Sequence, residues 1–404
     1  MRKLSIVAAA VALVGLVAAA TGAGQAQFKP AAANNAANAL VKCGTTRTIG
    51  VAYPATGPAA SIGVFQIHWA QFFASQWNKK HPKDKIRIVQ GDTQLPDTAK
   101  ALAVAHSFAS NSSMLGLVGP AGSQEVQDTA AVFKGGGLAM VSGSATRITL
   151  TRAQSGHARD TPVGYFYRTV PNDGQQGDRV ASWISKKMKK KRVYIIDDQE
   201  SYSTGLAEQV ENNLRAAGVN VNRDSVSQQI SDFSSVITRI PSNTQVVYIP
   251  WQLAGKAQLF YTQLRAAGKS AIVFGSDGTF APGTFTGAGS YVSSFPVDYN
   301  SPALKAFKRQ HGGQDEAFGL PTYTAALVNA TAIMKACKNG TASRAEVRSW
   351  IKKTILPKAQ TLLGFPVKFL SKNKGKQTGP GDMGGTADFG IYKIAASGKY
   401  NRVG

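Results

Sequence analysis

The 404-residue chain is poor in the residues that carry out catalysis and bind metals. It has two cysteines and five histidines, and its 22 acidic residues stand against 46 lysines and arginines. The histidines are scattered, and none pairs with another at metal-ligand spacing. There is no Cys-x-x-Cys, no Gly-x-Ser-x-Gly elbow and no complete phosphate-binding loop. These absences predict a protein that is not an enzyme and needs no metal or cofactor.

A second long apolar run is also lacking. The first, residues 6–20, follows two basic residues and is too short for a comfortable membrane span of about 20 residues. Small residues after it suit signal peptidase, and no cysteine stands there to carry a lipid. We therefore predict a signal peptide over 1–26, cleaved near Ala26, and export to the periplasm or the cell exterior. Residues 27–43, rich in Ala and Asn, read as a flexible leader.

The acid deficit gives a formal net charge of +24. The one dense basic run is 186–192, at the end of an expected helix, where cations suit the helix dipole. No stacking aromatics are interleaved with it, so we interpret it as a solvated face and expect no nucleic-acid partner. Binding of an anionic polymer or cell envelope stays open as an alternative.

The two cysteines are Cys43 and Cys337. In an exported protein such a pair predicts one disulfide, which would stabilise the fold by about 4 kcal/mol in the chain-entropy model. Two unpaired buried thiols are the alternative.

Short apolar runs alternate with segments of helical periodicity, a rhythm that restarts after about residue 170. This pattern is typical of parallel sheets with helices on both faces. Two helices are expected to end alike, at Leu214–Gly218 and Leu264–Gly268, with glycine just past each helix. The expected strands include 49–53, 86–89, 115–118, 138–141, 193–196, 246–249, 271–274 and 388–394. The predicted fold class is α/β, with two doubly wound lobes.

Small hydroxyl residues or acids follow three of these strands, at Gly119–Ser123, Ser142–Thr146 and Gly275–Gly278. Ligands of parallel α/β sheets bind outside the carboxyl ends of strands. The first segment turns directly into a helix, whose free N–H groups suit a carboxylate. A helix cap, a Ser/Thr turn and an Asx turn are the respective alternatives. Tyr202 and Trp251 also follow strands and are interpreted as walls of the site or as simple packing.

Taken in order, several segments resemble one known family. They begin with Ile-Gly-Val-Ala-Tyr-Pro-Ala-Thr-Gly-Pro and continue through Leu117–Pro120, Ser142–Thr146, Phe166–Thr169, Asp173–Gly177, Tyr202–Leu206, Asp232–Ser235 and Asp388–Tyr392. From about Thr46 to its end, the chain resembles the leucine/isoleucine/valine-binding family of periplasmic solute-binding proteins. Asp277 stands where that family more often has Glu, and Trp251 where it often has a smaller ring or Gly.

The resemblance implies a type I binding-protein fold, with two lobes joined by three crossover strands. Lobe 1 would comprise 44–167 plus 297–361, and lobe 2 would comprise 168–296 plus 362–404. The lobes would close on a small amino acid, branched-chain or otherwise apolar, and present it to an ABC permease. We expect a monomer.

The resemblance also implies which residues hold the ligand. Those of lobe 1 would grip its carboxylate and part of its ammonium, namely Ser123, Ser144 and Thr146. Those of lobe 2 would close over it, with Asp277 pairing with the ammonium beside Tyr202 and Trp251. Ser61 and Ile62 would touch the ligand side chain. Alternatives with the same fold are an amide, urea or aromatic carboxylate as ligand, or a ligand-sensing module.

Overall fold

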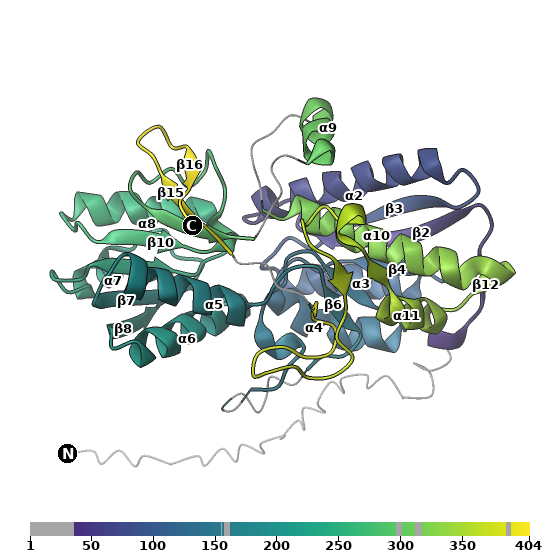
Figure 1. Ribbon diagram of the computed structural model, residues 1–404, viewed down its shortest axis with the longest axis horizontal. Coiled ribbons are helices and arrows are strands. Elements are labelled where there is room, and N and C mark those ends of the chain that lie inside the picture. Colours follow the sequence, from purple (N-terminus) through teal and green to yellow (C-terminus); the bar gives the residue numbers. More distant parts are fainter. Residues whose placement is uncertain (1–35, 155, 157–161, 296–300, 312–316, 385–388) are drawn as a thin grey trace, which may run out of the picture.

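The computed structural model describes residues 36–404 except 155, 157–161, 296–300, 312–316 and 385–388. The predicted signal peptide and most of the leader lie outside the described residues. The chain forms two lobes that stand side by side, each built around its own sheet (Figure 1). This confirms the predicted α/β class. In the described part, no helix is long and apolar enough to cross a membrane.

The first lobe contains a five-stranded sheet in the order β3-β2-β4-β5-β6, with every neighbouring pair parallel. Its central strands are buried on both faces, as the apolar runs 49–53 and 114–118 within them require. The strands are β2 (Thr46–Tyr53), β3 (Lys85–Asp92), β4 (Met114–Val118), β5 (Met140–Ser142) and β6 (Phe166–Arg168).

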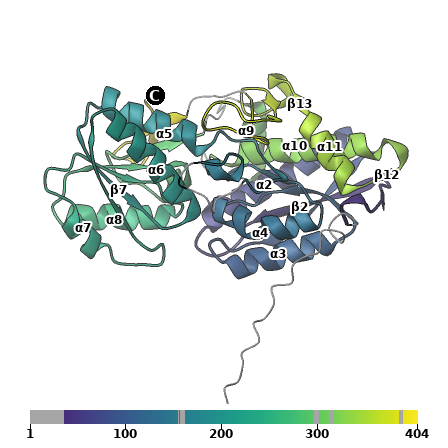
Figure 2. The same ribbon diagram turned by 90° about the horizontal axis from the view of Figure 1, so that it is seen from below.

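Helices cover both faces of this sheet. Two of them, α3 and α4, pack on one face, while α2, α10 and α11 pack on the other (Figure 2). A further helix, α9, packs on α2 through stacked Trp69 and Phe307 rings whose centroids lie 4.0 Å apart. The helices are α2 (Ala60–Lys80), α3 (Thr98–Ser110), α4 (Ser123–Gly135), α9 (Pro302–His311), α10 (Gly319–Ala336) and α11 (Arg344–Lys353).

The second lobe contains a seven-stranded sheet in the order β16-β15-β11-β10-β9-β7-β8. The five strands from β11 to β8 are parallel, and β15 runs antiparallel to both of its neighbours, β11 and β16. The strands are β7 (Arg192–Asp197), β8 (Asn220–Ser225), β9 (Val246–Ile249), β10 (Ile272–Gly275), β11 (Tyr291–Ser294), β15 (Gly390–Ile394) and β16 (Tyr400–Arg402).

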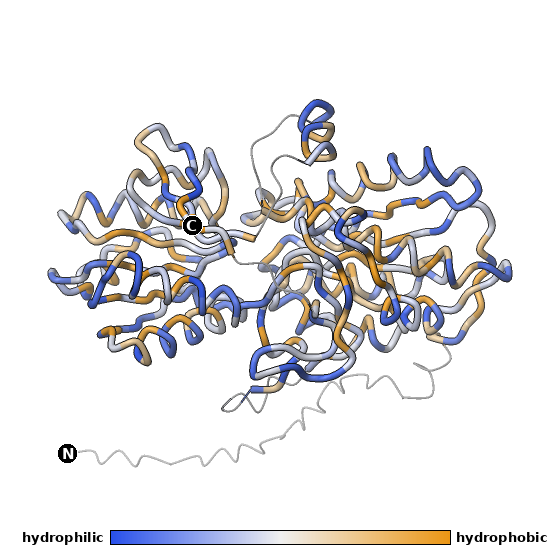
Figure 3. Tube along the Cα trace, in the orientation of Figure 1, coloured by the Kyte–Doolittle hydropathy of each residue, from blue (hydrophilic) through white to orange (hydrophobic). Residues whose placement is uncertain are grey.

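Helices again cover both faces. Figure 2 shows α5 and α6 on one side of β7, and α7 and α8 on the other, which matches the two apolar cores of this lobe. The hydropathy colouring of Figure 3 shows the same layering, with apolar residues concentrated along the inner strands. The helices are α5 (Asp173–Ser182), continued by a π-helical turn over Trp183–Lys187, α6 (Ser201–Ala216), α7 (Ser234–Arg239) and α8 (Ala254–Ala266).

The chain passes between the lobes three times. It leaves the first sheet after β6, returns after β11, and crosses again between Gly384 and Phe389. The third crossing corrects a predicted boundary, because the sequence assigned 362–404 as a whole to lobe 2. Phe369 and Met383 instead pack in the core of the first lobe, and only the chain from Phe389 onward joins the second.

Several contacts hold residues 362–384 on the first lobe, among them a strand pair and a buried ion pair. A short antiparallel pair joins β13 (Ile355–Leu356) to β14 (Val367–Lys368). Asp382 forms a 2.5 Å ion pair with Arg168 at the end of β6, and both side chains are buried. Buried charges of this kind persist only when paired, so the segment is fixed beside the first crossing.

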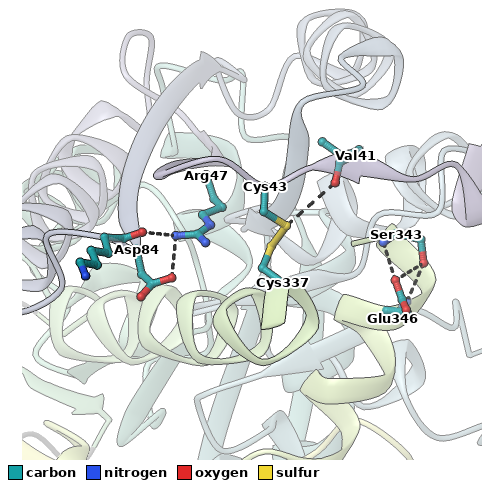
Figure 4. Close-up of a disulfide and its surroundings, with 8 residues drawn as sticks. Val41, Cys43, Arg47, Asp84, Cys337, Ser343 and Glu346 are labelled. Carbon is teal, nitrogen blue, oxygen red and sulfur yellow. Dashed lines mark hydrogen bonds and ion pairs between the residues drawn. A yellow bond between two sulfur atoms is a disulfide. The ribbon is translucent and has the colours of Figure 1, made fainter. Parts of the chain in front are cut away.

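The predicted disulfide forms between Cys43 and Cys337 (Figure 4). It ties the N-terminal β1 (Val41–Lys42) to the end of α10. The strand that pairs with β1, β12 (Thr341–Ala342), follows α10 closely. These elements lie at the end of the first lobe that points away from the second (Figure 1).

Candidate functional site

A pocket lies between the two lobes, at the carboxyl ends of both parallel sheets. Its empty space is about 310 Å³, part of which is open to solvent. The first lobe contributes Ile62, Leu95, Ala121, Gly122, Ser123, Ser144 and Phe318, and the second contributes Tyr202, Gln252, Asp277 and Gly278. Both sheets therefore present their strand ends to one site, as expected for ligand binding by α/β folds.

The first-lobe wall is built around the N-terminus of α4. Gly122 caps this helix and Ser123 begins it. Glu125 folds back and accepts a 2.8 Å hydrogen bond from the Gly122 N–H, so its carboxylate already serves the helix end. The Ser123 hydroxyl accepts a 3.1 Å hydrogen bond from the Arg147 N–H, which leaves its own proton to donate into the pocket. Burial raises the pKa of Glu125 to about 7, so protonation removes part of its charge near neutral pH. The helix dipole and the Ser123 hydroxyl can then attract an anion to this wall.

The neighbouring turn after β5 places Ser144 on the pocket wall, but its hydroxyl is already engaged. It donates to the Ala121 carbonyl at 2.8 Å and accepts from the Gln66 amide at 3.0 Å. It therefore has one remaining lone pair and no proton to offer a ligand carboxylate. Thr146 points elsewhere, toward the second lobe's Asp173, and is not part of the pocket lining.

The second-lobe wall carries the negative charge. Asp277 opens a 3-10 turn directly after β10, and its Oδ1 accepts a 2.5 Å hydrogen bond from the hydroxyl of Tyr202 in the first turn of α6. Both side chains are buried. Burial raises the pKa of Asp277 to about 6, although hydrogen bonds from Tyr202 and Gln176 oppose that rise. Burial and the adjacent carboxylate raise the pKa of Tyr202, which keeps it a proton donor.

A second acid, Asp173, reinforces this charge from the start of α5. Its side chain is fully buried, and neither carboxylate oxygen has a hydrogen-bond partner among the described residues. Burial raises its pKa to about 7, and the negative charge of Asp277 adds to the rise. The Thr146 hydroxyl is near enough to lower that pKa without completing a hydrogen bond. Arg168 and Arg147 lie near enough to lower the pKa of Asp173, so Asp277 is the acid that favours a cationic group between the lobes.

The remaining wall is apolar and consists of Ile62, Leu95 and Phe318. Ile62 comes from the first turn of α2, where the adjacent Ser61 is exposed to solvent and does not line the pocket. The pocket thus has an anion-attracting side, an acidic side and an apolar side.

Comparison with known proteins agrees with this arrangement. A sequence model of the periplasmic binding protein family matches residues 46–381. The chain belongs to this family. The Leu/Ile/Val-binding protein of Citrobacter freundii is 28% identical over 358 residues, which cover 85% of this chain and 89% of the relative. The Leu/Ile/Val-binding protein BraC3 of Rhizobium johnstonii is 29% identical over 312 residues, covering 74% and 81%. The resemblance inferred from the motifs is confirmed.

Solved structures of this family share the fold. The branched-chain amino acid transporter substrate-binding protein LivJ of Streptococcus pneumoniae, in complex with isoleucine, superposes with a TM-score of 0.72 at 20% identity, covering 89% of this chain and 99% of that one. A solute-binding protein of R. palustris in complex with benzoate gives a TM-score of 0.70 at 16% identity, covering 89% and 96%. The type I binding-protein fold is therefore confirmed.

One expected wall of this binding protein's site lies elsewhere. Trp251 is buried in the second-lobe core, where its ring stacks on Phe233 with centroids 5.2 Å apart. Its indole N–H donates to the Ile196 carbonyl at 2.7 Å. The adjacent Gln252 lines the pocket in its place. For Trp251 the structure therefore supports the alternative interpretation, packing in the core.

Sequence reasoning missed Asp173, which does not line the pocket but whose pKa is raised by burial and by the charge of Asp277, and it missed several lining residues. Asp173 reads from the sequence as part of the helix start after Asn172, and nothing local shows that it faces Asp277. Leu95 and Phe318 lie in connecting segments without a motif of their own. Gln252 could have been found, because it follows β9 only one residue later than Trp251 does. Within the described residues, no group of His, Cys, Asp or Glu side chains is placed to hold a metal ion.

Proposed function

We propose that this chain is the exported substrate-binding protein of an ABC importer, and that it binds an apolar amino acid, branched-chain for preference, between its lobes. The observation that carries the proposal is the opposition of an anion-attracting helix end and an acid across one pocket. The α4 N-terminus with Ser123 attracts an anion, and Asp277 with Tyr202 attracts a cation. An α-amino acid carries both groups on one carbon.

In this pose the ligand carboxylate lies at the start of α4 and its ammonium beside Asp277. The side chain then meets the apolar wall of Ile62, Leu95 and Phe318. Since the acid belongs to one lobe and the helix terminus to the other, the ligand joins the lobes and stabilises the closed form. The closed form is what a membrane permease would recognise. The predicted signal peptide places this step outside the cytoplasm, and we propose that a monomer performs it.

Thermal unfolding against a ligand panel tests the proposal. The mature protein is first unfolded, dialysed and refolded to remove bound ligand. A ligand at 100 times its dissociation constant stabilises the protein by about 2.7 kcal/mol. We expect a rise in Tm with leucine, isoleucine or valine, and none with benzoate, acetamide or urea. A rise with benzoate alone would favour a carboxylate ligand without an ammonium, and no rise with any compound would contradict amino-acid binding.

A further inference from the structure

We propose that Arg147 is the positioning residue that holds the two lobes closed and so sets how fast the ligand leaves. The proposal rests on the proposed function to the extent that closure retains a ligand. Arg147 belongs to the first lobe, between β5 and the 3-10 turn Ile148–Leu150, and it does not line the pocket. Its effect would therefore act through the second lobe, which includes Asp173, whose burial-raised pKa Arg147 helps to lower, and not through a ligand contact.

The side chain of Arg147 crosses to the second lobe. Its Nη1 donates to the backbone carbonyl of Ser201 and, at 3.2 Å, to the hydroxyl of Thr204, both in the first turn of α6. Within its own lobe, Nε donates to the Thr149 hydroxyl at 2.9 Å, which fixes the direction of the guanidinium. Arg147 is buried. A buried guanidinium requires acceptors, and the second lobe supplies two of them only when the lobes are closed.

A second contact supports the same edge of the lobe interface. The Ser201 hydroxyl donates to Oε1 of Gln127 on α4, with 2.5 Å between the oxygen atoms. The first lobe thus binds both the backbone carbonyl and the side chain of Ser201. The helices α4 and α6 meet only across the lobe boundary, so these bonds break when the lobes open.

The contact of Arg147 with α6 is connected to the pocket through one residue, Ser123. The Arg147 N–H donates to the hydroxyl of Ser123, which lines the pocket at the start of α4. A ligand carboxylate held at Ser123 therefore lies one hydrogen bond away from the arginine that crosses to α6. This connection would let the bound ligand and the closed lobes stabilise each other.

Gly205 shows that α6 is shaped around this arginine. A Cβ at this position would lie 2.7 Å from Nη1 of Arg147, closer than real Cβ contacts allow. Gly205 lies inside a helix, where alanine is the more stable residue. The close approach of the guanidinium gives a reason for glycine that the helix itself does not.

The test uses Arg147→Ala, Arg147→Lys and Gly205→Ala, with Arg87→Ala as the matched control. Arg87 is an exposed arginine of the same lobe, and among the residues that the structure describes its side chain bonds only Thr48 of that lobe. The probe is the amino acid that stabilises the wild type most. Dissociation constants are measured by calorimetry and dissociation rates by stopped-flow fluorescence. Thermal unfolding of the ligand-free proteins reports on folding.

We expect Arg147→Ala to weaken binding about tenfold or more, mainly through faster dissociation, because the contact exists only in the closed form. Arg147→Lys keeps the charge but not the forked geometry, so its affinity and dissociation rate should lie between those of the wild type and Arg147→Ala. Gly205→Ala should also speed dissociation while leaving the Tm of the ligand-free protein equal or higher. The double variant should resemble Arg147→Ala alone, because both changes remove one contact. Arg87→Ala should bind like the wild type.

Small-angle scattering of the ligand-free proteins gives a second measurement that needs no ligand. A larger radius of gyration in Arg147→Ala and Gly205→Ala than in the wild type and Arg87→Ala supports the proposal. Unchanged dissociation rates in both variants, with equal radii, would overturn it while leaving amino-acid binding intact. If the wild type binds no amino acid, the proposed function fails, and the radius alone decides the role of Arg147.

Discussion

The hydroxyl of Tyr202 donates a 2.5 Å hydrogen bond to Oδ1 of Asp277, and both residues belong to the second lobe. The acidic side of the pocket is therefore assembled before the lobes close. The anion-attracting side, at the start of α4, belongs wholly to the first lobe. If the pocket binds an amino acid as proposed, neither lobe alone presents both of its partners, and full affinity would require closure.

Replacing Asp277 with Asn tests the acidic side. The change keeps the size of the side chain and an acceptor for Tyr202 but removes the charge that would pair with the ammonium. Hydrogen bonds to charged groups are worth about 1.5–3 kcal/mol, so we expect amino-acid affinity to fall roughly 10- to 100-fold. Calorimetry measures this. The exposed Asp232→Asn is the control and should bind like the wild type; an Asp277→Asn affinity within threefold of the wild type would contradict the assignment.

Asp277→Asn also tests how the stability of the protein depends on pH. The pKa of Asp277 is raised from 3.8 to about 6 in the folded protein, so its contribution to stability is full below pH 3.8 and is lost as the pH rises through 6. Between pH 5 and 8 the ligand-free wild type should lose about 1 kcal/mol relative to Asp277→Asn. Urea unfolding of both proteins at several pH values measures the difference. Parallel stability curves would show that Asp277 ionises normally.

Amino-acid affinity should depend on pH in the opposite direction. An ammonium pairs with the ionised form of Asp277, so binding should strengthen as the pH rises from 5 to 7 and should release a proton near pH 6. Calorimetry in two buffers of different ionisation enthalpy detects the released proton. In Asp277→Asn this dependence should shrink, leaving the part due to Asp173, whose pKa is about 7.

Replacing Trp251 with Phe should affect stability and not binding. The change removes the N–H that donates to the Ile196 carbonyl, at a cost of about 1–3 kcal/mol of unfolding free energy. The ring itself packs on Phe233, outside the pocket. Denaturant unfolding and calorimetry separate the two effects. As a contrast, Tyr202→Phe removes a hydroxyl inside the pocket and should weaken binding.

Most of the fold could be predicted because its signals are local. The helix ends at Gly218 and Gly268 show this, since both glycines adopt the left-handed φ, 69° and 70°, that the repeated helix-end motif requires. Buried strands such as Met114–Val118 stand out as short apolar runs between turn residues. The position of residues 362–384 could not be predicted, because its determinant is a long-range ion pair between Asp382 and Arg168.

The site was harder to predict than the fold, because the sequence does not show in which direction each side chain points. Asp277 and Ser123 follow strands, so the sheet rule alone brings them to the pocket. The same rule also selects Trp251, because position after a strand does not tell which way a side chain points. Ser144 reaches the pocket, but its hydroxyl already donates to the Ala121 carbonyl and accepts from the amide of Gln66, which is far away in the sequence. Such pairings depend on the tertiary structure.

Removing the disulfide should lower stability without changing ligand affinity. The bond joins Cys43 and Cys337, which are 294 residues apart (Figure 4). It lies at the end of the first lobe that points away from the second (Figure 1). Because a crosslink restricts the unfolded chain, the paired Ser variant should lose about 2–5 kcal/mol of unfolding free energy. We expect its amino-acid affinity to stay within twofold of the wild type. Hydrogen exchange should rise first in β1 and β12, which the bond holds together. A large loss of affinity in folded variant protein would instead show that the far end of α10 is coupled to closure.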